Sequence, residues 1–102
     1  MLADLSGKTA IITGGGQGLG FGISTKMAQQ GANLIITDID DRNKSAISDL
    51  ASKYDIKYLY IEMNVTDQSQ VENGINEALE FSDVDILVNN AGVAGAPGST
   101  GT

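Results

Sequence analysis

Apolar residues along this chain fall into short continuous runs that alternate with longer amphipathic segments. The short runs are rich in β-branched residues, as buried strands are, and cover residues 9–13, 33–37, 57–63 and 85–89. The longer segments, 19–30, 41–53 and 67–80, space their apolar residues with the period of a helix. Strands that alternate with helices predict a parallel sheet with right-handed crossovers, packed as a three-layer α/β sandwich.

The predicted helices carry signals at their ends and along one face. Gly31 follows the first helix and predicts its C-terminal cap. Thr66 or Asp67 is expected to cap the third helix, with Gln70 reaching back as in a capping box. The expected buried faces are Ala46, Ile47, Leu50 and Ala51 on the second helix and Val71, Ile75, Ala78 and Leu79 on the third.

Composition narrows the class of protein. The 102 residues suffice for one small domain, and 41% hydrophobic with 19% charged residues is ordinary for a soluble globular protein. The net charge of −7 repels polyanions, so no nucleic-acid partner is expected. The absence of cysteine and histidine excludes disulfides, thiolate chemistry and histidine-based catalytic or metal sites. Because the chain shows no basic-apolar leader and no long apolar run, we expect a cytoplasmic protein without a membrane partner.

A glycine-rich turn joins the first predicted strand to the first predicted helix. It reads Thr13-Gly14-Gly15-Gly16-Gln17-Gly18-Leu19-Gly20. Such a turn lets the backbone approach a pyrophosphate and directs the free N–H groups of a helix N-terminus at the anion. The alternative is a flexible turn that needs glycine only for positive φ angles. The strand before it, the helix after it and an acid downstream favour phosphate binding.

The acid downstream is Asp38, which follows the second predicted strand and precedes Ile39. A carboxylate at this place can accept hydrogen bonds from both ribose hydroxyls of an adenosine, and it repels a 2′-phosphate. No basic residue follows Asp38 directly, and the nearby Arg42 is preceded by the acids Asp40 and Asp41. These features favour NAD over NADP as the cofactor. The alternative is a solvated carboxylate in a charge-rich loop.

Two more motifs end the third and fourth strands: Asn64-Val65 and Asn89-Asn90-Ala91-Gly92. Together with Thr13-Gly14-x-x-x-Gly18-x-Gly20, they resemble the signatures of the short-chain dehydrogenase/reductase family, and the resemblance runs from residue 5 to residue 92. It implies a Rossmann-type sandwich with the strand order 3-2-1-4. It also implies an incomplete NAD(P)-binding domain at residues 1–92, followed by a Gly-rich flexible tail at 93–102.

The resemblance carries a set of cofactor-binding residues onto this chain. In the family the turn wraps the pyrophosphate, the acid holds the ribose, the Asn64-Val65 position meets the adenine, and the last motif lies beside the cofactor. The candidates are Gly14, Gly16, Gln17, Gly18, Leu19, Gly20, Asp38, Ile39, Asn64, Val65, Asn90, Ala91 and Gly92. The family usually has Asp where Asn64 stands, and an amide oxygen accepts more weakly than a carboxylate. The alternatives are a polar turn residue at Asn64 and an ordinary strand-to-loop turn at residues 89–92.

The family's catalytic residues have no counterpart in these 102 residues. Hydride transfer in the family uses a Tyr, a Lys four residues later and a Ser. None of Tyr54, Tyr58 and Tyr60 is followed by a lysine four residues on, and Ser99 lies in the predicted tail. We therefore expect a truncated chain that is inactive alone, and we assign it no catalytic residue and no metal ligand.

The leading hypothesis is the NAD-binding part of a short-chain oxidoreductase whose parent type acts on alcohols or carbonyls. The alternatives are a non-catalytic NAD-sensing or interaction module and a subunit of a split enzyme. In the order 3-2-1-4 the apolar strand Ile86-Leu87-Val88 lies at a sheet edge, which predicts a covering partner. That partner is either the missing C-terminal half or a second copy of the chain.

Overall fold

The computed structural model describes residues 4–90 as an alternation of strands and helices. In chain order the elements are β1 (Thr9–Thr13), α1 (Gly18–Gln29), β2 (Asn33–Asp38), α2 (Lys44–Tyr54), β3 (Tyr58–Glu62), α3 (Gln68–Phe81) and β4 (Ile86–Asn89). Every strand pair is parallel and the order across the sheet is β3-β2-β1-β4, so the predicted order is confirmed. Ala91, Gly92 and the predicted tail at 93–102 lie outside the described residues.

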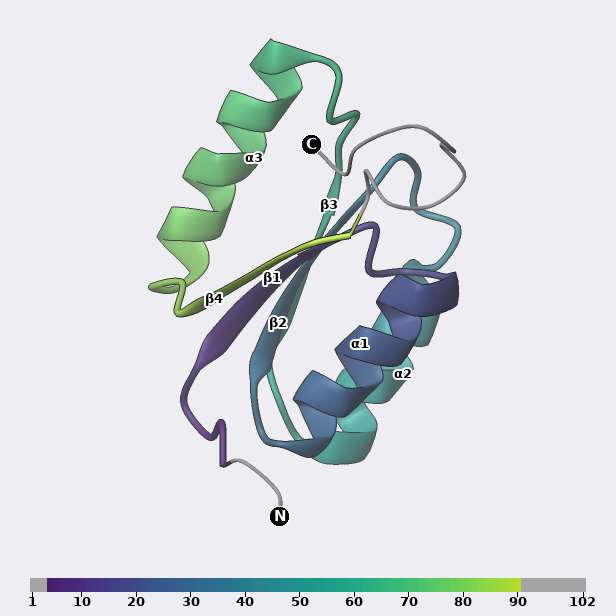
Figure 1. The fold of residues 1–102 in the computed structure, drawn as a ribbon, viewed down its shortest axis with the longest axis vertical. Coiled ribbons are helices and arrows are strands. Elements are labelled where there is room, and N and C mark those ends of the chain that lie inside the picture. Colours follow the sequence, from purple (N-terminus) through teal and green to yellow (C-terminus); the bar gives the residue numbers. More distant parts are fainter. Residues whose placement is uncertain (1–3, 91–102) are drawn as a thin grey trace.

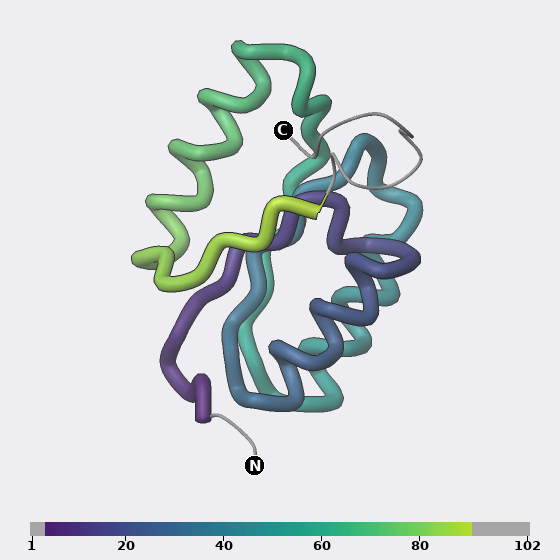
Figure 2. Tube along the Cα trace, viewed as in Figure 1, coloured from purple at the N-terminus to yellow at the C-terminus, as the bar shows by residue number. Residues whose placement is uncertain are grey.

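Helices cover both faces of the sheet. Figure 1 shows α1 and α2 packed side by side on one face and α3 alone on the other. Figure 2 shows β1 in the middle of the sheet, between β2 and β4. The two neighbours of β1 are thus strands that lie far apart in the sequence. The three-layer sandwich is thus confirmed, with α1 and α3 on opposite faces as right-handed crossovers require.

The core consists of two apolar clusters, one on each face of the sheet. Successive side chains of a strand point to opposite faces, so Leu34 and Ile36 join one cluster and Ile35 the other. The cluster under α1 and α2 contains Ala10, Ile12, Ala28, Leu34, Ile36, Ile47, Leu50 and Tyr60. The cluster under α3 is smaller and contains Ile35, Ile61, Met63 and Ala78. The central strand β2 is buried on both faces, as a parallel strand inside a sandwich is.

Both helices of the larger layer end in the same C-terminal motif. After α1, Gly31 has a φ of +95°, its N–H donates to the Ala28 carbonyl over 2.9 Å, and the Ala32 N–H donates to Met27 over 3.1 Å. This Schellman motif confirms Gly31 as the cap residue. After α2, Asp55 takes the left-handed conformation with a φ of 55°, and the Ile56 N–H donates to Ala51. The sequence analysis did not predict a cap at Asp55, where no glycine signals it.

The starts of α2 and α3 differ from the predictions in detail. Helix α2 begins at Lys44 rather than at residue 41, because the Lys44 N–H closes a turn onto the Asp41 carbonyl over 3.0 Å. Helix α3 is capped by Asp67, whose carboxylate accepts from the Gln70 N–H. The predicted return bond of the capping box is wrong: the Gln70 Oε1 accepts from Asn64 instead, since the Asp67 N–H already donates to the Asn64 carbonyl.

The predicted buried face of α3 is only partly buried. Ala78 is buried, but Ile75 and Leu79 are 49% and 60% exposed. The helix contacts the sheet through its small residues, because a Cβ added at Gly74 would lie 2.6 Å from the sulfur of Met63. Ile75 and Leu79 therefore lie on the flank of the contact. None of the helices within residues 4–90 is long and apolar enough to cross a bilayer.

Candidate functional site

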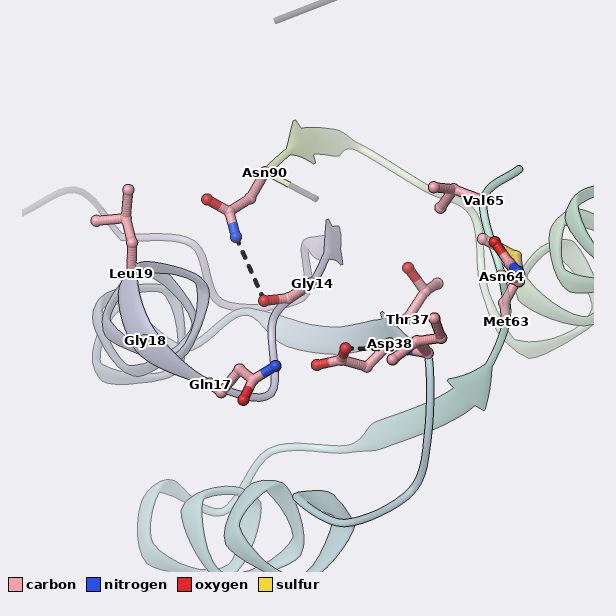
Figure 3. A pocket seen from close by; sticks show the side chains of 11 residues that line it. Gly14, Gln17, Gly18, Leu19, Thr37, Asp38, Met63, Asn64, Val65 and Asn90 are labelled. Carbon is pink, nitrogen blue, oxygen red and sulfur yellow. Dashed lines mark hydrogen bonds between the residues drawn. The ribbon is translucent and has the colours of Figure 1, made fainter. Parts of the chain in front are cut away.

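The carboxyl ends of the strands open onto a cleft of about 460 Å³ (Figure 3). The glycine-rich turn and the ends of β2, β3 and β4 contribute its walls. The lining residues are Gly14, Gln17, Gly18, Leu19, Thr37, Asp38, Ile39, Met63, Asn64, Val65 and Asn90. All of these except Thr37 and Met63 are predicted site residues, so the fold brings four separate segments of the sequence to one place.

Four predicted site residues do not line this cleft in the described structure. Gly16 and Gly20 are buried behind its surface, and both pack against groups of the site. Ala91 and Gly92 lie outside the described residues. The last described residue, Asn90, brings the N-N-A-G motif to the cleft.

Hydrogen bonds from three elements hold the glycine-rich turn in place. The Gly14 N–H donates to the Thr37 carbonyl of β2 over 2.6 Å, and the Asn90 amide donates to the Gly14 carbonyl over 3.3 Å. The Ser24 hydroxyl of α1 lies 3.0 Å from the Gly15 carbonyl oxygen and is buried. The turn is therefore pre-formed, and a ligand that binds it need not order it.

The contact between this turn and the start of α1 needs glycine at position 20. A Cβ at Gly20 would lie 2.0 Å from the Gly14 carbonyl oxygen and 2.7 Å from the Asn90 amide nitrogen. The first of these neighbours is backbone and cannot swing aside. The absence of a side chain at Gly20 therefore permits this close packing, and it fixes where α1 begins relative to β1.

The N-terminus of α1 is free of side-chain caps. Its N-cap residue, Gln17, makes no side-chain capping bond, and the first turn contains no acidic residue. The first N–H groups of a helix have no partner inside the helix, and the helix dipole makes this end electropositive. Gln17, Gly18 and Leu19 line the cleft at this point. The arrangement suits an anionic group such as a pyrophosphate.

Asp38 stands at the junction of β2 and the cleft. One carboxylate oxygen accepts from the Gly16 N–H over 3.3 Å and the other from the Ile39 N–H over 2.9 Å. A Cβ at Gly16 would lie 2.9 Å from the carboxylate, so the absence of a side chain there lets Asp38 pack against the turn. These two bonds fix the orientation of the carboxylate, and Asp38, which is 9% exposed, lines the cleft.

Tyr60 of β3 forms a hydrogen bond with the loop after Asp38. The Tyr60 hydroxyl donates to the Asp40 carbonyl over 2.9 Å. Burial and the nearby carboxylates, Asp38 first among them, raise the pKa of Tyr60 to about 12, so it stays protonated and able to donate. The Arg42 guanidinium pairs with the Asp40 carboxylate at 3.0 Å. Hydrogen bonds from Arg42 lower the pKa of Asp40. The same bonds hold the Arg42 side chain against Asp40 within the loop.

Asn64 has its side-chain oxygen engaged in a local turn. Its Oδ1 accepts from both the N–H and the hydroxyl of Thr66, over 3.0 and 2.7 Å. An amide oxygen has two lone pairs, so both are used here. The expectation that this oxygen accepts from an adenine amino group requires one of these bonds to break.

Thr37 and Met63 line the cleft although the sequence analysis did not name them. A polar residue directly after the apolar run 34–36 of a buried strand was the signal available for Thr37. Met63 directly precedes the Asn64-Val65 motif, and its apolar side chain gives no chemical signal. Both are buried, and only the folded sheet shows that they reach the cleft.

The lining fits a nucleotide better than a metal ion. A helix N-terminus, a carboxylate and an apolar floor occupy one elongated cleft, which matches an anionic, a hydroxylic and an aromatic part of one ligand. No group of three or more His, Cys, Asp or Glu side chains suited to a metal lies within residues 4–90.

Comparison with known proteins agrees with this geometry. The family model described as short chain dehydrogenase matches residues 8–101. The L-2,3-butanediol dehydrogenase of Corynebacterium glutamicum is 38% identical over 90 residues, which are 85% of this chain and 35% of that protein.

Two solved structures share the fold. The L-sorbose reductase of Gluconobacter frateurii, complexed with NADPH and L-sorbose, matches with a TM-score of 0.85 and 32% identity, over 93% of this chain and 37% of its own. The carveol dehydrogenase of Mycobacterium avium, in complex with NAD, matches with a TM-score of 0.82 and 25% identity, over 92% and 39%. The chain thus spans well under half the length of the proteins it matches.

The packing at position 20 predicts opposite effects for two substitutions in α1. Gly20→Ala should lower the free energy of unfolding by about 1–3 kcal/mol, because the new methyl group collides with the Gly14 carbonyl. The control is Gly22→Ala, where a Cβ meets nothing within 4 Å. It should raise the same free energy by about 0.5–1 kcal/mol through helix propensity. Urea denaturation measures both; equal effects would show that the close contact is not a constraint.

Proposed function

Because the chain belongs to the short-chain dehydrogenase family, we propose that its cleft binds NAD as the cofactor of an oxidoreductase of alcohols and carbonyls. The proposal is carried by one observation: the uncapped N-terminus of α1 and the Asp38 carboxylate line the same cleft. We assign the binding unit to residues 1–92, which contain all of the family signatures.

The proposed roles follow the chemistry of the walls. The backbone N–H groups of Gln17, Gly18 and Leu19 bind the pyrophosphate, supported by the helix dipole. Asp38 accepts from the ribose hydroxyls. The apolar surface of Ile39, Met63 and Val65 supports the adenine.

The remaining predicted residues act beside or beneath these groups. Gly14, Gly16 and Gly20 shape the turn, and Asn64 lies at the adenine end. Asn90, with Ala91 and Gly92, borders the cofactor at the other end. When bound, the nicotinamide ring supplies the hydride acceptor or donor of the reaction.

Charge favours NAD over NADP. A 2′-phosphate on the ribose would lie close to the Asp38 carboxylate and be repelled by it. Arg42, the nearby cation that could offset this repulsion, is paired with Asp40. The related structures include one complex with NAD and one with NADPH, so the preference of this chain rests on these local charges.

Replacing Asp38 with Asn removes the charge and keeps the shape. We expect the affinity for NAD to fall about tenfold or more, because hydrogen bonds to charged groups are stronger than those to neutral groups. The ratio of the affinity for NADP to the affinity for NAD should rise, because the repulsion of the 2′-phosphate is removed. Isothermal titration with both nucleotides measures the ratio. Asp41→Asn is the control, since Asp41 is exposed and does not line the cleft, and it should leave both affinities unchanged. A wild-type chain that binds NADP more tightly than NAD would contradict the assignment.

The 102 residues contribute cofactor binding rather than the complete reaction. They contain no Tyr-x-x-x-Lys sequence, and positioned acid/base groups typically contribute about 10²–10⁴-fold to rate. We expect the purified 102-residue chain to bind NADH without oxidising it in the presence of a simple ketone, as followed by absorbance. Turnover that disappears in a Gly14→Val variant would show that another group of this chain completes the site.

The edge of β4 supports a further part of the proposal, namely that more polypeptide covers it. Leu87 on this strand is 68% exposed, and Ile75 and Leu79 of α3 are exposed as well. We expect the 102-residue chain to self-associate as its concentration rises, and Leu87→Glu to suppress the association in sedimentation velocity. A wild-type chain that sediments as a monomer at every concentration would exclude a second copy as the covering partner.

A further inference from the structure

The hydroxyl of Thr37 is a buried polar group without a hydrogen-bond partner among the described residues. Thr37 is 4% exposed, and its Oγ1 has no partner within residues 4–90. Burying an unpaired hydroxyl is costly, so such a group calls for a partner that the chain itself does not supply. The backbone of the same residue is satisfied on its acceptor side, because its carbonyl receives the Gly14 N–H.

The neighbours of Thr37 in the sheet do not offer that partner. In register with Thr37 lie Thr13 on β1 and Ile61 on β3. The Thr13 hydroxyl accepts from the Asn90 N–H over 2.8 Å and lies 3.1 Å from the Asn89 side-chain oxygen. Ile61 is apolar. The Thr13 hydroxyl therefore bonds to residues at the end of β4, and the Thr37 hydroxyl has no partner among the described residues.

The Thr37 hydroxyl lies at the wall of the cleft. Thr37 lines the cleft between Gly14 and the Met63–Val65 wall, and Figure 3 shows its oxygen on the side that faces Gly14, Asn90 and Val65. Asp38, the proposed ribose ligand, is the next residue along β2. A ribose carries a base and a 5′-phosphate, and the apolar side chains of Met63 and Val65 beside Thr37 suit the base.

The state of Asn64 gives the hydroxyl a specific task. The exocyclic amino group of adenine needs a hydrogen-bond acceptor, and the Asn64 oxygen is already occupied by Thr66. Thr37 provides an acceptor that is buried, fixed and unused. A hydroxyl oxygen accepts hydrogen bonds through its lone pairs, so it can accept from the amino group.

We propose that the Thr37 hydroxyl is the hydrogen-bond acceptor for the adenine amino group, and that it makes the cleft selective for adenine nucleotides. The inference rests on the proposed binding of NAD and adds a residue that the family signatures do not mark. It predicts that removing the hydroxyl improves the folding of the empty protein and weakens its binding of the nucleotide.

The test compares Thr37→Val and Thr37→Ser with the wild-type 102-residue chain. Isothermal titration uses NAD, AMP and purine riboside 5′-monophosphate, which lacks the amino group. The valine variant should bind NAD and AMP about 2–10-fold more weakly, the range of one neutral hydrogen bond, and should bind the analogue as the wild type does. The serine variant keeps an Oγ and should retain most of the preference for AMP. In thermal unfolding without nucleotide, the valine variant should melt at a higher temperature than the wild type.

Each outcome separates this inference from the proposed function. If the wild type binds NAD, and the valine variant binds NAD and AMP as tightly as the wild type does, water satisfies the hydroxyl. The inference is then wrong while the proposed function stands. If the valine variant loses affinity for AMP and the analogue to the same extent, Thr37 shapes the cleft but does not accept from the amino group. If the wild type binds neither NAD nor AMP, both proposals fail.

Discussion

The close contact between the Gly14 carbonyl and Gly20 is the constraint on which the cleft depends. A side chain at position 20 would overlap that oxygen, so α1 starts where it does because the position has none. The same carbonyl accepts from the Asn90 amide, which ties the turn to the residue after β4. One oxygen atom thus joins the first strand, the first helix and the far edge of the sheet. The N-terminus of α1 faces the cleft as a result.

The proposed anion site has no basic side chain. The chain has only six Lys and Arg residues against 13 Asp and Glu, and none of the described residues that line the cleft is Lys or Arg. Backbone N–H groups and the helix dipole therefore supply the positive potential, while Asp38 supplies a negative one a short distance away. The positive helix N-terminus and the negative Asp38 therefore favour different parts of one ligand. A pyrophosphate fits one end, and a neutral sugar with free hydroxyls fits the other.

Thr37 lines both the cleft and a second groove on the α3 side of the sheet. A mostly apolar groove of about 380 Å³ lies between the sheet and α3, and it shares Thr37, Met63 and Val65 with the cleft. These residues lie in or follow the strands whose apolar neighbours Ile35 and Ile61 form the smaller core cluster. The packing of α3 thereby reaches the cleft through its floor. A change in how α3 is seated would alter the surface that meets a bound base.

The sequence by itself determined the order of the elements and the parallel sheet, because periodicity acts over a few residues, and the resemblance of its motifs to a known family supplied most of the cleft's lining. The sequence also identified Gly31 as a cap and Asp67 as one of two candidate caps, since both use groups close in the chain. Only the tertiary structure decided that Ile75 and Leu79 lie on a flank and that Gln70 bonds to Asn64. It alone left the Thr37 hydroxyl without a partner among residues 4–90. A hydrogen bond forms only when two atoms lie about 3 Å apart, and for groups on different strands that distance is set by the register and packing of the whole sheet.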